Sequence, residues 1–182
     1  FGTGRYLQLV DTSDTSTQTF YGIWDQGGMT GTINVPDRSV LVKQTLLAEV
    51  TANTTNLTAF RLTSNNLVSY PAQKGWYLDL QTSSSALPQG ERVIFNPVIR
   101  AGRVIFTTVI PSPSACSFGG DGWLMELDAV SGSRLAATPF DVNNDNQFST
   151  ADYLKAGASG DAIPVSGRRS TVGIPSAPTI LS

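Results

Sequence analysis

The sequence predicts an all-β fold, a partial β-propeller made of four-stranded antiparallel blades. Short apolar runs rich in Val, Ile, Tyr, Phe and Thr alternate with clusters of Gly, Pro, Ser, Asn and Asp, which is the pattern of many strands and turns. Patterns typical of helices are nearly absent. A glycine-led motif recurs as GRYLQL, GWYLDL and GWLMELD, and the last two copies are separated by about the 40–50 residues of one blade.

Strands are expected wherever apolar and polar residues alternate between two turn clusters. These segments are 6–10, 19–25, 40–51, 57–63, 67–70, 76–80, 92–99, 103–110, 123–127 and 134–136. Segments 93–99 and 104–110 are joined by RAGR, so we expect a hairpin with Gly102 at its turn. One short helix is expected at 150–155. The tail from 172 to 181 is typical of the first strand of a further blade, so residues 1–182 are expected to be a fragment of a larger propeller domain.

Composition restricts the class of protein. The chain has 182 residues, of which 40% are hydrophobic and 14% charged, which is enough apolar material for one packed domain. The net charge is -2 and no run of Lys or Arg occurs, so neither nucleic acid nor an anionic membrane surface is an expected partner. No apolar stretch approaches the roughly 20 residues of a membrane helix, and the first residues lack the features of a signal peptide.

The absence of histidine argues against most hydrolytic and transition-metal chemistry. It removes the usual general base, the Ser-His and Cys-His dyads and the commonest transition-metal ligand. Cys116 is the single cysteine, so any disulfide partner would lie outside this chain. No GxSxG, Walker, CxxC or HExxH motif occurs. We therefore expect a protein that is not an enzyme and has no catalytic residues.

One stretch, FDVNNDNQFSTADYL at 140–154, has the oxygen-ligand spacing of a cation loop. An EF-hand-type loop takes its ligands from positions 1, 3, 5, 7, 9 and 12. In this chain those positions are Asp141, Asn143, Asp145, Gln147, Ser149 and Asp152. Three carboxylates at this spacing repel one another unless a dication lies between them. The sequence therefore predicts a single calcium site with these six residues as metal ligands.

Three positions determine how well this loop matches an EF-hand-type loop. Position 6 is Asn146 instead of Gly, and Asn is the non-glycine residue that most readily adopts positive φ. Position 12 is Asp152 instead of Glu, which shortens the reach by one methylene, and position 8 is Phe148, an apolar residue expected to tie the loop to the protein body. The alternative is an Asx-rich surface turn without a metal. Magnesium is disfavoured because it keeps its own waters.

Other motifs have structural explanations. FGTGRYL lacks a third glycine and a following helix, so it predicts a strand turn and not a phosphate cradle. The carboxylates beside the repeated strands are expected to cap turns, and not to form a glycosidase pair; they are Asp25, Asp79, Glu126 and Asp128. The tryptophans expected in the core, and not on a sugar-binding surface, are Trp24, Trp76 and Trp123. The glycosylation sequons at Asn53 and Asn56 match a short pattern that arises easily by chance.

Six separated blocks form an ordered series along nearly the whole chain: FGTGRYL, FYGIWD, GWYLDL followed by GERVIFNPVI, VIFTTVIP with Cys116 after it, GGDGWLMELDAVSG, and VGIPSAPTIL. Together they closely resemble the C-terminal propeller domain of the PilY/PilC family, the type IV pilus biogenesis and tip adhesin proteins. The resemblance covers the later part of that domain. It implies a modified β-propeller, exported and surface-associated, that promotes pilus assembly, opposes retraction and takes part in adhesion and surface sensing under the control of calcium.

These expectations combine into one hypothesis, a non-enzymatic calcium-binding propeller segment of a pilus protein. The resemblance implies pilin or minor pilins, host or surface receptors and the remaining blades of the propeller as partners, at the cell surface, pilus tip, outer membrane or periplasm. The family's familiar D-x-[ND]-x-D loop lies nearer the start of the propeller, so 141–152 is expected to be a distinct site. Two alternatives stay open: a quinoprotein-type enzyme, suggested by GWLMELDAVSG, and a calcium-stabilised carbohydrate-binding module.

Overall fold

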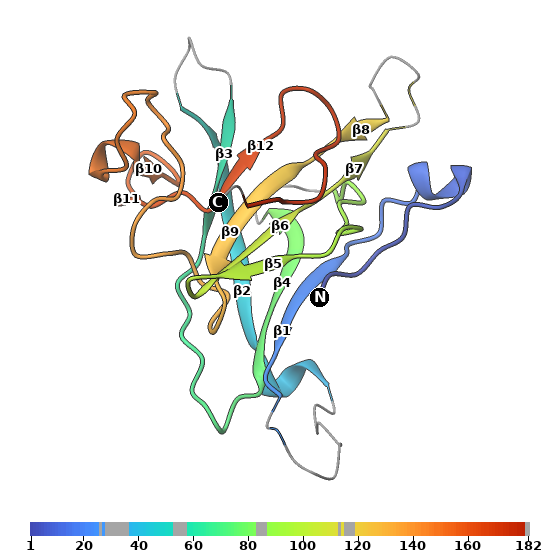
Figure 1. Ribbon diagram of the computed structural model, residues 1–182, viewed down its shortest axis with the longest axis horizontal. Helices are drawn as coiled ribbons and strands as arrows, with labels where there is room; N and C mark the ends of the chain where they lie inside the picture. The colour runs from blue at the N-terminus through green and yellow to red at the C-terminus, as the bar shows by residue number, and fades with distance from the viewer. Residues whose placement is uncertain are drawn as a thin grey trace.

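The computed structural model describes residues 1–25, 27, 37–52, 58–82, 87–112, 114 and 119–180 (Figure 1). The strands of the main sheet are β1 (Thr19–Ile23), β2 (Val42–Thr51), β3 (Ala59–Thr63), β4 (Gly75–Thr82), β5 (Val98–Arg100), β6 (Arg103–Thr107), β9 (Trp123–Asp128) and β12 (Gly167–Arg169). Two ribbons pair β7 (Ile110–Pro111) with β8 (Gly120–Asp121) and β10 (Leu154–Lys155) with β11 (Ala162–Ile163). The described residues also form the short 3-10 turns η1 (Leu9–Thr12), η2 (Arg38–Val40) and η3 (Thr150–Asp152).

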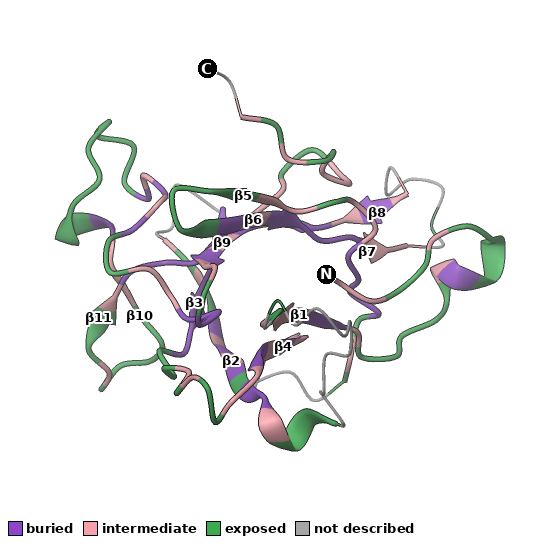
Figure 2. Cartoon of the chain, turned by 60° about the horizontal axis from the view of Figure 1, so that its bottom comes forward, coloured by how far each residue is buried: buried purple, intermediate pink, exposed green. Residues whose placement is uncertain are grey.

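The main sheet consists of two sets of four strands joined by the pairing of β3 with β12. Its order is β1-β4-β2-β3-β12-β9-β6-β5, and it curls so that its two halves face each other (Figure 2). Neighbouring strands are antiparallel except β2 and β4, which are parallel. This parallel pair differs from the expected antiparallel blade. The connection after β3 crosses to the other side of β2, so β4 runs in the same direction as β2. The all-β fold class itself is confirmed.

The main core lies between the two halves of the sheet. Phe20 of β1 stacks on Phe106 of β6 with their ring centroids 4.0 Å apart. Trp76 and Trp123, which occupy equivalent places in the recurring motif, are buried in the same cluster as expected. Buried and partly exposed residues alternate along β4 and β9, as required of strands that pack one face on a core. The recurring motif therefore supplies one core strand to each half.

The N-terminal segment runs along the outer edge of β1. Tyr21 N–H donates to the Phe1 carbonyl at 2.8 Å, and Thr3 N–H donates to the Thr19 carbonyl at 2.9 Å. Val93 N–H in turn donates to the Thr3 carbonyl at 3.2 Å. Residues 1–3 thus link one edge of the curled sheet to the loop that precedes β5.

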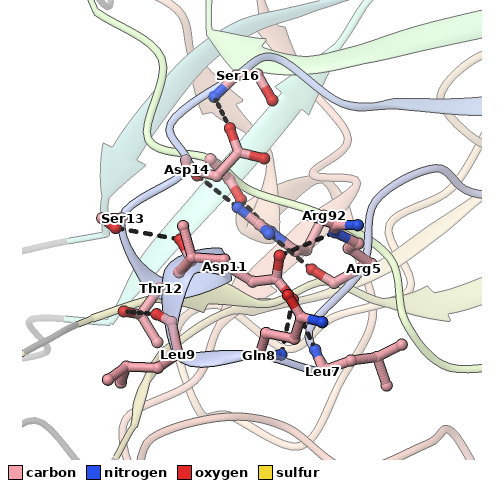
Figure 3. A network of polar contacts seen from close by, with 12 residues as sticks. Arg5, Leu7, Gln8, Leu9, Asp11, Thr12, Ser13, Asp14, Ser16 and Arg92 are labelled. Atoms are coloured by element: carbon pink, nitrogen blue, oxygen red, sulfur yellow. Dashed lines mark hydrogen bonds and ion pairs between the residues drawn. The ribbon is translucent and has the colours of Figure 1, made fainter.

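The strand expected at 6–10 is wrong, because side-chain hydrogen bonds turn this segment into η1 (Figure 3). Asp11, which is 1% exposed, accepts the backbone N–H groups of Leu7 and Gln8 and the Nε–H of Arg5, each at 2.9 Å. Buried Arg92 donates to the carbonyl of Arg5 at 2.7 Å. This network provides the backbone groups of the segment with hydrogen-bond partners, which in a strand would come from a neighbouring strand.

Most of the other expected strands are present. Those at 19–25, 40–51, 57–63, 76–80, 103–110 and 123–127 correspond to β1, β2, β3, β4, β6 and β9, and β5 with β6 forms the expected hairpin. Only the end of 92–99 is a strand, and 67–70, 134–136 and 172–180 contain none. Leu67 and Val172 are 75% and 86% exposed, so neither side chain packs against a sheet among the described residues. The helix expected at 150–155 is reduced to η3, which β10 follows.

Candidate functional site

The predicted cation loop, residues 141–152, lies outside the main sheet between β9 and β10, in orange in Figure 1. Phe140 and Val142 anchor its start, because both are buried in a second apolar cluster with Phe60 and Leu62 of β3. Phe148 is 64% exposed, so the anchor expected at position 8 is wrong. The residues on either side of position 1 hold the loop to the body instead.

The first half of the loop is wound around the carboxylate of Asp141. Its Oδ1 accepts the N–H groups of Asn144 at 2.7 Å and Asp145 at 3.2 Å, and its Oδ2 accepts the N–H of Asn146 at 2.9 Å. Asn143 Oδ1 accepts the N–H of Asp145 at 2.9 Å. These are Asx-type turns, in which a short side chain bonds the backbone a few residues ahead.

Two asparagines provide the backbone conformation that such winding needs. Asn144 and Asn146 both have φ of 62°, in the left-handed region that Asn tolerates better than other non-glycine residues. The replacement of Gly by Asn at position 6 is therefore accommodated as expected. Asp145 Oδ1 accepts the Gln147 N–H at 2.8 Å, while its Oδ2 accepts Nδ2–H of Asn143 at 3.1 Å.

Asp152 closes the loop from inside. Its side chain is buried, and Oδ1 accepts the N–H groups of Val142 at 2.8 Å and Asn143 at 3.3 Å. Its Oδ2 accepts the Ser149 N–H at 2.9 Å, and Ser149 Oγ accepts the Ala151 N–H at 3.1 Å. One carboxylate therefore ties the beginning of the loop to η3 at its end.

The six predicted ligands belong to one compact loop, and their donor chemistry suits a hard cation. All six offer oxygen atoms, and Asn143, Asp145, Gln147 and Ser149 are exposed. Asp141, Asp145 and Asp152 are not drawn together: among the described residues, no group of three or more His, Cys, Asp or Glu side chains is close enough to hold a metal. Their oxygens accept backbone N–H groups, an arrangement that leaves further lone pairs for an ion.

The other carboxylates singled out in the sequence have structural partners and do not converge. Asp79 pairs with Arg38 at 3.0 Å and with Lys43 at 3.3 Å on the outer face of the sheet. Glu126 pairs with Arg103 at 3.3 Å. Two further side chains accept local backbone N–H groups; they are Asp128, bonded to Val130 and Ser131, and Asp25, bonded to Gly27. Turn capping, as expected, accounts for the last two.

A buried ion cluster was not predicted from the sequence. Arg61 of β3 contacts Glu91 with two nitrogens and Glu49 at 2.7 Å, and its guanidinium lies 4.0 Å from the Trp123 ring centroid. Burial lowers the pKa of Arg61, but the charge of Glu91, its hydrogen bonds and those of Glu49 outweigh burial, so the net pKa is raised above its ordinary value. The sequence offered one signal for this cluster, the single charged residue Arg61 between the apolar residues of AFRLT.

Several predicted features lie elsewhere. Trp24 is only partly buried, and its ring meets Tyr70 edge-on at 5.1 Å between centroids, so the core position expected for it is wrong. Cys116 and the sequons at Asn53 and Asn56 lie outside the described residues. In the part of the chain that the structure describes, no helix has the length and apolar character to span a membrane.

Comparisons with known proteins agree with the fold. No protein-family model matches the chain. The crystal structure of the Pseudomonas aeruginosa PilY1 C-terminal domain superposes with a TM-score of 0.78 at 29% identity, over 94% of this chain and 35% of that one. The curled all-β sheet is therefore part of a β-propeller domain of this kind.

Sequence relatives supply the family. A type IV pilus biogenesis factor PilY1 homolog from Xylella fastidiosa is 34% identical over 98% of this chain, and another from the same organism is 37% identical over 72%. Type IV pilus biogenesis factor PilY1 from Pseudomonas aeruginosa is 35% identical over 78%. The chain belongs to the PilY1 family and corresponds to part of its C-terminal domain. It spans 8% to 13% of the length of these relatives.

Proposed function

We propose that the chain is a non-enzymatic propeller segment of a type IV pilus biogenesis protein that supports pilus extension against retraction and attachment to surfaces. The observation that carries this proposal is the 34% identity to a PilY1 homolog over 98% of the chain, together with the match to the solved C-terminal domain. The protein acts outside the cytoplasm, at the cell surface, pilus tip, outer membrane or periplasm. Its partners are pilin or minor pilins and receptors on the surface that is bound.

A calcium ion held by the 141–152 loop is the second part of this proposal. Asp141, Asn143 and Asp145 supply side-chain oxygens from one wound turn, the Gln147 carbonyl and Ser149 follow at the expected spacing, and Asp152 closes the loop. The ion would draw the carboxylates of the loop together and brace the loop. Buried Phe140 and Val142 would transmit that bracing to β3.

Genetic complementation tests the pilus role. In bacteria that lack their own PilY1-family protein, we expect the complete protein carrying this chain to restore surface pili, whereas the same protein without residues 1–182 should not. A strain that cannot retract its pili separates a role in pilus assembly from a role in opposing retraction. A protein that is needed only to oppose retraction is dispensable in that strain. Equal piliation with and without this segment in both strains would refute the role, and turnover of an alcohol with a bound quinone would refute the non-enzymatic assignment.

A further inference from the structure

A polar pocket of about 510 Å³ lies on the outer face of the main sheet, over β1, β4 and β2. These three strands are neighbours in the sheet order, with β4 in the middle (Figure 1). Along β4 the core-facing side chains are Trp76, Leu78 and Leu80, whereas Asp79 and Gln81 alternate with them and line the pocket. The floor of the pocket is therefore a continuous surface inside the sheet and not a sheet edge.

Arg38 of η2 is held in a fixed position at one side of this pocket. Asp37 caps η2, because its side chain accepts the N–H of Ser39 at 2.7 Å. The Arg38 guanidinium lies 5.2 Å and 4.7 Å from the ring centroids of Tyr21 and Tyr77. Its Nε–H also donates to the Tyr21 hydroxyl at 2.8 Å. The cation is therefore positioned before any ligand arrives, which lowers the entropic cost of binding.

The charged groups of the pocket have a net positive charge. Thr19, which is 2% exposed, donates to Asp79 Oδ1 and accepts from Arg38 Nη2, each at 2.8 Å. Asp79 also contacts Arg38 at 3.0 Å and Lys43 at 3.3 Å. Two cations and one carboxylate, the charged side chains among the described lining residues, give a net charge of +1. In the described structure Arg38 uses three of its five N–H donors and Lys43 one of three, so both can bind a further anion.

The uncharged part of the lining selects a ligand rich in hydroxyl groups. It consists of groups that both donate and accept hydrogen bonds, and includes Thr17, Thr45, Thr82 and Gln81. β4 is paired on both sides, with β1 and β2, so its backbone offers no free edge to an extended peptide. A net charge of +1 is too small to follow a nucleic-acid backbone. A sugar that carries a carboxylate matches both the cations and the hydroxyl groups.

We propose that this pocket binds an acidic saccharide, with Arg38 and Lys43 contacting the carboxylate of a uronic acid and the surrounding polar side chains contacting its hydroxyl groups. The pocket volume lies within the roughly 300–1,000 Å³ of small-ligand sites. The inference names a ligand class for the surface attachment in the proposed function, and it rests on that function for its biological setting alone. Binding requires neither calcium in the 141–152 loop nor a pilus, so its failure would leave both of those proposals standing.

Calorimetric titration of the complete purified protein with trigalacturonate, in the presence of a calcium chelator, tests the ligand class. The chelator removes any calcium that would bridge the sugar to the 141–152 loop. Trigalacturonate should bind, more weakly as salt is raised, and its uncharged methyl ester should bind at least about tenfold more weakly. Absence of trigalacturonate binding, or equal binding of the ester, would contradict the proposal. Equal binding of triglutamate would assign the pocket to acidic peptides and would contradict it as well.

The position of the site is tested at Lys43, whose side chain is 55% exposed. Lys43→Met should weaken trigalacturonate binding about tenfold or more, because it removes one of the two cations. Lys155→Met is the matched control at an exposed lysine outside the pocket and should bind as the wild type does. Equal affinity of the two variants would place the sugar elsewhere.

A second measurement on the wild-type protein needs no variant. Trigalacturonate should protect the Lys43 amine from reductive methylation and leave Lys155 unprotected, as read by mass spectrometry. Methylation of Lys43 that is the same with and without the sugar would contradict the proposal, as would equal protection of both lysines.

Discussion

At the scale of single residues, buried charges organise this small β domain. Arg61, Glu91, Arg92 and Asp11 are each at most 2% exposed, and the structure gives each of them specific polar partners. A buried charge without its partner is costly, whereas a complete pair is close to neutral in stability. All four residues are therefore expected to be sensitive to single substitutions, and Arg61 with Glu91, which form a side-chain pair, to tolerate a matched double one.

Arg61→Met should lower the free energy of unfolding by about 3–5 kcal/mol, because it leaves the buried Glu91 carboxylate without its counter-ion. The double variant Arg61→Met with Glu91→Leu should recover much of that loss. Arg100→Met, at an exposed site, should change stability by about 0.5 kcal/mol or less. Chemical denaturation measures all three; a double variant as unstable as the single one would show that the pairing is not the cause.

Asp11 predicts a dependence of stability on pH. Hydrogen bonds from the N–H groups of Leu7 and Gln8, with a smaller contribution from Arg5, hold the pKa of the Asp11 carboxyl below its ordinary value. The stabilisation that Asp11 gives the folded protein is therefore complete above its pKa in the unfolded chain, about 3.9. It is lost as pH falls through the lower pKa that Asp11 has in the folded protein. The free energy of unfolding should fall more steeply below about pH 4 in the wild type than in Asp11→Asn. Asp161→Asn is the exposed control, and parallel profiles for all three proteins would contradict the assignment.

At the scale of elements, the sequence predicts a strand correctly where apolar and polar residues alternate and the segment also has a neighbouring strand with which to pair. β4 and β9 follow from GWYLDL and GWLMELD, whose aromatic residues enter the core. GRYLQL has the same pattern, yet Asp11 and Arg92 bind its backbone and make a turn. Local alternation cannot reveal such a competitor, because Arg92 is distant in sequence. The loop at 141–152 was predictable in its turns, since Asx chemistry is local, but not in its anchoring by Phe140.

The β5–β6 hairpin offers a test of local backbone conformation. Gly102 has φ of 75°, and a Cβ at this position would meet no atom within 4 Å. Gly102→Ala should therefore cost about 1–2 kcal/mol from the left-handed conformation alone. Gly160→Ala is the matched control, because its Cβ would also meet nothing within 4 Å and its φ is not positive. Thermal unfolding compares them, and equal melting temperatures would contradict a conformational cost at the turn.

At the scale of the whole molecule, the ordered sequence blocks predicted the family and the fold class, and the comparisons confirm both. The joining of two four-strand sets into one curled sheet was not predictable, because it depends on Gly167 of β12 pairing with both Arg61 and Met125. The parallel pairing of β2 with β4 depends likewise on how a connection crosses the sheet. Long-range pairing of this kind leaves no periodic signal in the strands themselves.

Calorimetric titration tests the calcium site proposed for the 141–152 loop. The wild type should bind one ion with a dissociation constant of roughly 0.1–1 mM, as in extracellular modules. Asp145→Ala should abolish the binding heat, because it removes an exposed ligand carboxylate, while Asp161→Ala, on an exposed residue outside the loop, should bind as the wild type does. Binding heat that is the same in the wild type and in Asp145→Ala would contradict the assignment.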